Sequence, residues 1–346
     1  MSISTLSILN APKLSVHESQ RQLLDAQKEL SVGRHADVGL QLGGKTADAI
    51  ALRNGFDRNS SLIDMNGLAA TELDITQSAL TSLIDLAHTF SATLIGARNA
   101  QSGQDVVKTA AKSALESLNS ILNQTHAGKF IFAGINSDVA PLSDYFSTPA
   151  SAGKSVVDAA FLSEFGVAQN SAGAGSITAS QMDTFLNGNY AALFGAGAWS
   201  TTFSFASDQN RIARIDSDYS VEVSTSANEA AFRDLTMAIT MAFDLGSGSL
   251  NQAAFEKIVD KAVIVSTKAA QEAGLIAGRL GTAEKVIADS TQRLKQRNEI
   301  LNREIVSLEG VDQYEVSTRI TLLTTQLEAS YSITARISRL NLMNYL

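Results

Sequence analysis

One stretch of the sequence matches a phosphate-binding pattern. Residues 39–46 read Gly-Leu-Gln-Leu-Gly-Gly-Lys-Thr, which is the spacing of the glycine-rich loop of nucleotide hydrolases. In such a loop, backbone N–H groups at the start of a helix hold the phosphates, and Lys45 would contact the terminal one. The loop also requires a buried strand before its first glycine, whereas residues 33–38 are polar. The sequence favours an ordinary loop before a helix, and a cytosolic nucleotide-binding coiled-coil protein using Gly39–Thr46 stays an alternative.

Other groups that could do chemistry are scattered. The histidines are far apart and none has a second ligand three or four residues away, so they predict no metal site: His17, His35, His88 and His126. The chain has no cysteine, which excludes disulfides, thiolate metal sites and thiol catalysis. The Gly-x-Ser-x-Gly motif of serine nucleophiles is also missing. The sequence predicts neither an enzyme nor a bound cofactor.

The composition favours helices and a solvated, acidic middle segment. Of the 346 residues, 45% are hydrophobic but only 6% aromatic, so the apolar content is mainly aliphatic. Residues 1–134 hold 11 Lys+Arg and 12 Asp+Glu, residues 135–270 hold 7 and 14, and residues 271–346 hold 9 and 9. The net charge of −8 is thus concentrated in the middle of the chain. An acidic segment of this kind disfavours nucleic-acid binding.

The sequence contains no recognisable targeting segment. Its first ten residues lack the charged and apolar regions of a signal peptide, so we expect none. No run approaches about 18 apolar residues, so we also expect no insertion into a membrane.

Two long segments repeat an apolar residue at every seventh position. A sustained seven-residue repeat produces an apolar stripe that a partner helix must cover. The two segments are natural partners of one another, which predicts an antiparallel helical rod. Its intrachain seam is formed by Leu73, Leu80 and Leu94 in a helix predicted over 46–99, and by Leu280, Ile287, Leu294, Leu301 and Leu308 in the segment before Gly310.

A second apolar stripe follows Gly310. Steps of three and four residues place Val316, Leu323 and Leu327 on one face of a helix. Within the chain only the short segment 14–30 remains to cover this helix, so part of the stripe needs other molecules. We predict an assembly or chaperone surface made by both ends of the chain: Leu323, Leu327, Ile333, Ile337, Leu340, Ile3, Leu6, Leu23 and Leu24.

The middle of the chain has a different composition, and it completes the predicted fold. Residues 135–200 are rich in Ala, Ser, Gly and Phe, and alternating patterns at 201–206, 211–216 and 220–224 predict a small meander of strands. We predict a mainly α fold: an elongated antiparallel helical rod of paired N- and C-terminal helices with an inserted small α+β domain. The predicted domains are a terminal helical assembly layer (1–45 and 311–346), a helical rod (46–134 and 226–310) and an outer α+β domain (135–225).

Several short motifs resemble those of the bacterial flagellin superfamily. Residues 27–34, Gln-Lys-Glu-Leu-Ser-Val-Gly-Arg, are similar to its step from a helix to Ser-x-Gly-basic. Gly278-Arg-Leu280 and residues 310–316, Gly-Val-Asp-Gln-Tyr-Glu-Val, resemble the motifs that flank its penultimate helix. Gly128-Lys-Phe-Ile-Phe-Ala-Gly134 and the ending 338–346 resemble the branch of the family at the hook–filament junction. The resemblance covers 1–134 and 228–346, while the glycine-rich loop 37–45 departs from the family pattern.

This resemblance implies a structural, non-enzymatic subunit that joins the hook of the bacterial flagellum to its filament. It implies end helices that become ordered on assembly, and export in an unfolded form through the flagellar type III channel to the cell exterior. The implied partners are other copies of the chain in a helical assembly, a neighbouring hook-associated protein, flagellin, and an export chaperone that binds the C-terminal helix. A filament flagellin is the alternative within the same family.

Overall fold

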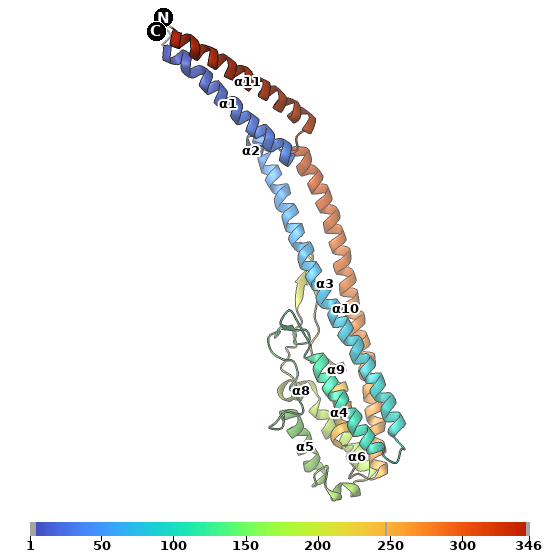
Figure 1. The fold of residues 1–346 in the computed structure, drawn as a ribbon. Coiled ribbons are helices and arrows are strands. Elements are labelled where there is room, and N and C mark those ends of the chain that lie inside the picture. The colour runs from blue at the N-terminus through green and yellow to red at the C-terminus, as the bar shows by residue number, and fades with distance from the viewer. Residues whose placement is uncertain (1–4, 246–247, 344–346) are drawn as a thin grey trace. The chain divides into compact units, whose positions relative to one another are not determined.

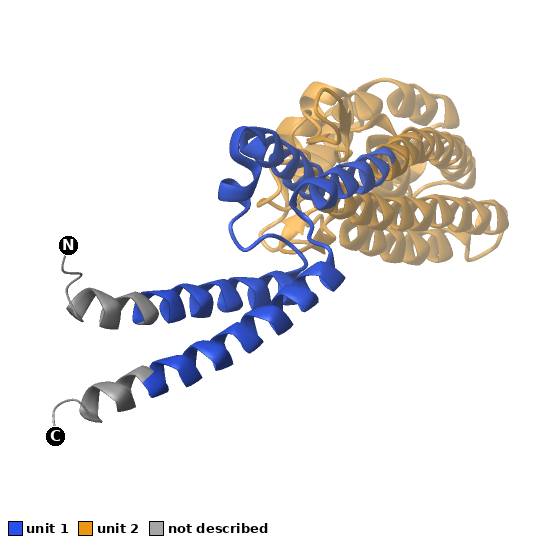
Figure 2. Ribbon diagram, turned by 90° about the horizontal axis from the view of Figure 1, so that it is seen from above, with its two compact units in different colours: residues 1–61, 293–346 blue, residues 62–292 orange. Residues whose placement is uncertain are grey.

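The computed structural model consists mainly of helices (Figure 1). It describes residues 5–245 and 248–343, with side-chain environments for 13–245 and 248–336. Two compact units are distinguished (Figure 2): unit 1 comprises residues 1–61 and 293–346, and unit 2 comprises residues 62–292. The division into three domains stays a prediction.

The elements confirm the predicted mainly α fold class. The α-helices are α1 (Thr5–Val32), α2 (Val38–Leu42), α3 (Thr46–Ala97), α4 (Gly103–Leu122), α5 (Ala152–Phe165), α6 (Ala179–Asn187), α7 (Asn189–Leu193), α8 (Ala196–Thr202), α9 (Ala230–Thr240), α10 (Gln252–Glu309) and α11 (Gln313–Met343). Shorter helical turns are η1 (Gly43–Lys45), η2 (Ala172–Ser176) and the π-helical turn η3 (Met241–Leu245). Two antiparallel hairpins pair β1 (Thr125–His126) with β2 (Lys129–Phe130), and β3 (Ile212–Arg214) with β4 (Ser220–Glu222).

In unit 2, α3 and α10 pack along apolar stripes. Gln77 on α3 donates a hydrogen bond to the Ala277 carbonyl on α10 (2.7 Å), and Ser91 on α3 is hydrogen-bonded to Ser266 on α10 (2.7 Å). Residue numbers therefore rise along α3 while those of its partners fall along α10. This register means that the two helices run antiparallel. Steps of three and four residues keep the buried side chains on one face of each helix. They include Leu73, Leu80, Leu83, Phe90 and Leu94 on α3, and Leu280 and Ile287 on α10.

The middle of unit 2 adds aromatic side chains to the same core. Phe203 stacks on Phe194 (ring centroids 4.9 Å apart) and on Trp199 (5.2 Å). The strand expected at 201–206 is wrong, because α8 continues to Thr202 and Phe203 is buried against these rings. Burial of a large aromatic side chain outweighed the weak preference of an alternating pattern for a strand.

The β3–β4 hairpin is held against both long helices of unit 2. The Ile215 carbonyl accepts hydrogen bonds from Asn66 Nδ2 (3.1 Å) and Ser290 Oγ (3.0 Å), and Arg211 pairs with Glu72 (3.0 Å). Asn66 and Ser290 are buried, and buried polar groups need partners. Asn66 lies seven residues before Leu73, so it replaces an apolar seam residue at the point where the hairpin docks.

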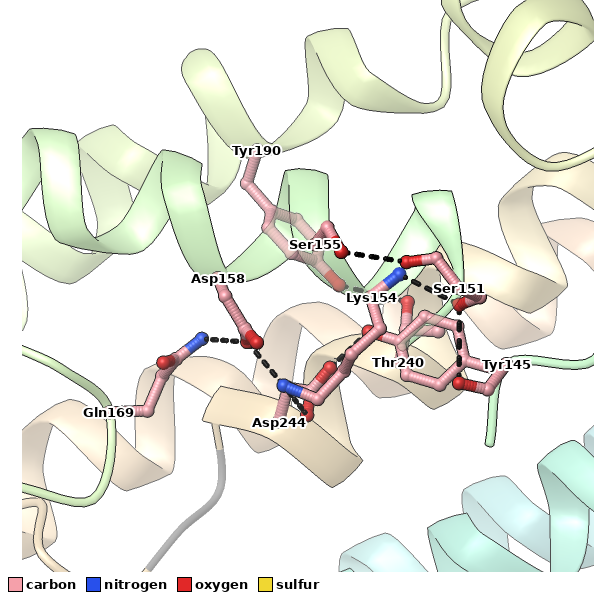
Figure 3. Close-up of polar contacts among 9 residues, drawn as sticks. All are labelled: Tyr145, Ser151, Lys154, Ser155, Asp158, Gln169, Tyr190, Thr240 and Asp244. Atoms are coloured by element: carbon pink, nitrogen blue, oxygen red, sulfur yellow. Dashed lines mark hydrogen bonds and ion pairs between the residues drawn. The ribbon is translucent and has the colours of Figure 1, made fainter. Parts of the chain in front are cut away.

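A polar cluster lies between α5 and η3 (Figure 3). The buried Asp244 accepts a hydrogen bond from the Tyr145 hydroxyl and lies 3.3 Å from Lys154 Nζ, which also pairs with Asp158. Burial raises the pKa of Asp244 and outweighs the opposing effects of Tyr145 and Lys154. Burial raises the pKa of Tyr145 as well, and the neighbouring Asp244 adds to that rise. Asp244 consequently holds its proton to a higher pH than a solvated aspartate does.

Among the described residues, the helical stretch Val38–Ala97 is long and apolar enough to cross a membrane by length and composition, with a mean hydropathy of 1.2 in its best window. A core helix of a soluble protein passes the same test. In α3 the leucines at 73, 80, 83 and 94 are covered by the core of unit 2, so packing within the chain explains the apolar composition.

Candidate assembly surface

In unit 1, α1 and α11 lie side by side as an antiparallel pair (Figures 1 and 2). Ala26, Val316 and Leu323 form their buried core, and Leu23 and Ile320 pack against it. These side chains meet because the stripe of each helix recurs at steps of three and four residues. Two helices can cover only the stripes that face each other, so the other faces of the pair stay open to solvent.

Polar contacts fix the register of this pair. Glu29 is buried and its carboxylate lies 3.3 Å from Arg319, while it also accepts a hydrogen bond from the Ala36 N–H (3.1 Å). Further along the pair, Gln20 Nε2 donates to the Tyr331 hydroxyl (2.6 Å). A one-turn slip would separate the buried Glu29 carboxylate from Arg319, so this contact favours the observed register.

A joint connects the pair to the rest of unit 1, and we define it by Gly33 and Gly310. Gly33 ends α1 in the left-handed region (φ +71°), which glycine adopts without strain. A Cβ on Gly310 would lie 2.4 Å from the Val306 carbonyl oxygen, so only glycine fits there. The segment that follows α1 and the segment between α10 and α11 are hydrogen-bonded to each other. The His35 N–H donates to the Glu309 carbonyl (3.0 Å), and the Val311 N–H donates to the Gly33 carbonyl (3.2 Å).

A buried carboxylate stabilises this joint. Glu309 is 1% exposed, and Arg53 binds it through two hydrogen bonds, one of them Nε–Oε1 at 2.7 Å. Arg34 lies 3.9 Å from the same carboxylate. The hydrogen bond to Glu309 raises the pKa of Arg53, with burial acting in the opposite direction. Two parallel hydrogen bonds from one guanidinium fix both the position and the angle of the Glu309 carboxylate relative to Arg53. This pair therefore connects the last turn of α10 to the first turns of α3.

Large apolar side chains remain exposed on unit 1. Exposed apolar groups gathered on one part of a protein are typical of interaction sites. On the α1–α11 pair they include Leu14 (70% exposed), Leu24 (66%), Leu322 (66%), Tyr331 (51%) and Ile333 (54%). We call these five residues the open face residues. Their exposure shows that packing within the pair leaves these side chains uncovered.

The predicted assembly residues fall into three groups. Leu323 and Leu327 are buried and Leu23 is half-buried, so they hold the pair together. Leu24 and Ile333 are exposed. Ile3 lies outside the described residues, as do the side chains of Leu6, Ile337 and Leu340. An assembly role for all nine stays a prediction.

The predicted seam residues lie where α3 and α10 pack within each unit. Leu73, Leu80, Leu94, Leu280 and Ile287 are buried in unit 2. Helix α10 continues into unit 1, where Leu294 is buried and Leu301 and Leu308 are half-buried.

The glycine-rich segment 39–46 does not form a phosphate loop. Helix α2 and turn η1 occupy it, and Asp37 caps α2 by accepting from the Leu40 N–H (2.9 Å). The Thr46 hydroxyl donates to the Gly43 carbonyl (2.7 Å). The preceding element is helix α1, where a phosphate loop requires a buried strand. In the part of the chain that the structure describes, no group of three acidic or histidine side chains could hold a metal ion.

Sequence reasoning missed the Glu309–Arg53 pair and the exposed Leu14 and Leu322. The glutamate is followed by Gly310, and a charged residue directly before a helix-ending glycine could have indicated a capped joint. Leu322 adjoins the predicted Leu323, and adjacent leucines on a helix face different directions, which could have indicated a second stripe.

Comparisons with known proteins identify both ends of the chain. Residues 3–137 match the bacterial flagellin N-terminal helical region, and residues 264–346 match the bacterial flagellin C-terminal helical region. Together the two matches cover more than half of the sequence. No curated protein matches the chain.

Two solved structures are similar to the chain. A flagellar hook-associated protein from Vibrio parahaemolyticus has a TM-score of 0.53 and 11% identity, and the similarity covers 77% of this chain and 97% of that one. FlgL of Bacillus cereus has a TM-score of 0.49 and 10% identity, over 74% of this chain and 99% of that one. At this identity the first similarity shows a shared fold.

Proposed function

The chain belongs to the bacterial flagellin family, and we propose that it is the structural subunit that joins the flagellar hook to the filament. Members of this family are structural, and a place in a flagellar polymer follows from membership. The open face residues carry the proposal, because a two-helix pair with exposed leucine, isoleucine and tyrosine side chains is suited to packing against further helices.

The junction role is supported by two observations. Gly128-Lys-Phe-Ile-Phe-Ala-Gly134 and the ending Asn-Tyr-Leu346 resemble the junction branch of the family more than filament flagellins. The name of the Vibrio parahaemolyticus protein, hook-associated, agrees with that interpretation. On this proposal the neighbours in the flagellum are a further hook-associated protein on one side and flagellin on the other.

The physical driving force for assembly is burial of the open face residues. Covering a fully exposed leucine or isoleucine side chain contributes about 1.5–3 kcal/mol. An isolated helix gains little from its intrinsic propensity, so α1 and α11 depend on packing for their order. Contacts with neighbouring copies supply that packing, and head-to-tail repetition of one contact generates a helical array.

Export and chaperone binding belong to the same proposal. A chain without cysteine forms no disulfide that would block passage in an unfolded form through a narrow channel. Before assembly, the exposed Leu322 and Ile333 on α11 are suitable contacts for an export chaperone that shields the C-terminal helix.

Deletion of the gene in a motile cell tests the junction role. We expect normal hooks without attached filaments, and flagellin released into the medium, as seen by electron microscopy and by immunoblotting of the culture supernatant. Restoring the gene should restore attachment. Loss of flagellin itself from the medium would instead identify the chain as the filament flagellin, and unchanged filaments would contradict both roles.

A further inference from the structure

Helix α2 presents a leucine to solvent in a fixed position. Leu40 is 84% exposed, although the short helix that carries it is capped at both ends. Asp37 binds the Leu40 N–H, and the Gly43 N–H donates to the Gly39 carbonyl. An exposed leucine on a rigid turn loses little conformational freedom on binding, which makes it suitable as an anchor residue.

The turn that follows this helix carries a cation. Lys45 in turn η1 is exposed, and within the described residues it has no hydrogen-bond or ion-pair partner. Asp37, the only acidic residue of the 37–46 segment, already caps the helix. The segment therefore offers one exposed apolar side chain, Leu40, and one unpaired positive charge, Lys45. We call Leu40 the knob.

The first turns of α11 form a hollow of opposite character. Its volume is about 400 Å³, and it is lined by Asp312, Tyr314, Glu315, Thr318, Arg319 and Leu322. Tyr314 is 84% exposed and Leu322 66%, so the hollow has an apolar wall that no described residue covers. Its two acidic residues outnumber its one arginine: Asp312 accepts hydrogen bonds from the N–H groups of Tyr314 (2.8 Å) and Glu315 (3.4 Å), and Glu315 pairs with Arg319 at 2.7 Å. The hollow consequently carries a net negative charge.

We propose that Leu40 of one copy of this chain seats in the α11 hollow of a neighbouring copy, with Lys45 facing Asp312 and Glu315. The inference rests on the proposed function, because it assumes assembly with other copies. Leu40 and Tyr314 are both largely exposed within one chain, so the knob does not fill the hollow of its own molecule. Apolar character and opposite charge make a second copy the fitting occupant.

A contact of this kind is head-to-tail. The knob and the hollow are different surfaces, so each copy can bind one neighbour through its knob and another through its hollow. Such contacts form a ring or an open helical series, as opposed to a closed pair. The glycine-rich loop that departs from the family pattern thereby acquires a role in lateral packing of the subunits.

The absence of native cysteines allows a direct test by cross-linking. Cells would express two versions of the chain, Leu40→Cys and Leu322→Cys, each with a single cysteine. Oxidation of isolated flagella should give a cross-linked dimer only when both versions are present, since a disulfide needs Cα atoms within about 7 Å. Leu68→Cys, at a 70% exposed position of unit 2, replaces Leu40→Cys as the control and should give no product with Leu322→Cys.

The outcomes separate this inference from the proposed function. Attached filaments without a cross-link between positions 40 and 322 would overturn the knob-and-hollow contact and leave the junction role standing. Dimers that join only two copies of the Leu40→Cys version would overturn it as well. Filaments that attach while neither version is incorporated into flagella would remove the junction role itself.

Charge reversal provides a second measurement if the cysteine versions assemble poorly. Lys45→Glu should reduce the fraction of cells with attached filaments severalfold, and the double variant Lys45→Glu, Glu315→Lys should restore it. Lys257→Glu, an equal change of charge on an exposed part of unit 2, should leave attachment unchanged. A double variant that stays as defective as Lys45→Glu would contradict the proposed pairing.

Discussion

Two buried carboxylates of this chain are compensated in different ways. Glu309 lies between Arg53 and Arg34 at the joint of unit 1, so its charge is balanced directly. Asp244 in unit 2 accepts a hydrogen bond from the Tyr145 hydroxyl and forms an ion pair with Lys154, but Lys154 also pairs with Asp158. Burial disfavours the charged form unless partners outweigh it, and at Asp244 they do not. Glu309 is therefore suited to fixing geometry, whereas Asp244 makes stability depend on pH.

We predict the direction of this pH dependence. The pKa of Asp244 is raised in the folded state, so its contribution to stability is fully present below the unfolded pKa of about 3.9 and is lost as the pH rises through the folded value. Asp244→Asn removes the titration, so the stability of the variant relative to the natural chain should increase as the pH rises from acid to neutral.

Denaturation followed by Trp199 fluorescence measures this difference, because the chain has one tryptophan and it is buried in unit 2. Asp158→Asn, at the more exposed partner of Lys154, serves as the control. A stability difference between the Asp244 variant and the natural chain that is constant with pH would contradict the assignment.

At the level of single helices, the residues of α3 are divided between the apolar core, a polar contact and solvent. Leu80 is fully buried in the core of unit 2, while Leu68 on the same helix is 70% exposed. Asn66 is buried at a seam position and bonds the β3–β4 hairpin. One helix thus contributes a core stripe, a polar contact for the hairpin and a solvent-facing stripe.

Truncation at these two leucines should have very different effects. Leu80→Ala leaves a cavity in a packed core, so we expect it to lower the free energy of unfolding by about 2–5 kcal/mol. Leu68→Ala removes the same atoms from a solvated site and should change it by less than about 0.5 kcal/mol. Urea denaturation of both variants measures the difference, and equal losses would mean that the core of unit 2 lies elsewhere.

At the scale of the whole molecule, unit 1 and unit 2 differ in how they are stabilised. Unit 2 holds one large apolar cluster that includes Trp199, Phe232 and Leu235. The α1–α11 pair in unit 1 has a buried cluster of Ala26, Val316 and Leu323 among the described residues. Its described residues bury few apolar side chains, so we expect this pair to gain stability from neighbouring copies.

Removal of residues 311–346 tests this difference. The buried core described for unit 2 is built from other segments of the chain, so the Trp199 transition should be retained close to its natural midpoint. α1 loses its partner, and helicity measured by circular dichroism should fall by more than the deleted residues account for. Attachment of filaments should be lost. A truncated chain that unfolds as a whole would show that unit 2 depends on the terminal pair.

Local sequence patterns were sufficient to predict the long helices, their antiparallel pairing and the family. Heptad spacing is a local property, and the positions of Leu73, Leu80, Leu280 and Ile287 were readable because a helix repeats every 3.6 residues. Gly310 likewise indicated the break between α10 and α11, and the terminal motifs indicated flagellin.

The face of each helix that is covered depends on packing between distant segments, and the folded chain was needed to identify it. Leu323 and Leu24 have equivalent sequence signals, yet one is buried and the other exposed. The tertiary structure also decided that Phe203 ends a helix against an aromatic cluster, that Glu309 meets Arg53 across 256 residues, and that segment 37–46 forms a capped turn with Leu40 outward. The physical reason is the same in each case: burial and charge compensation depend on segments far away in the sequence, and local periodicity does not contain that information.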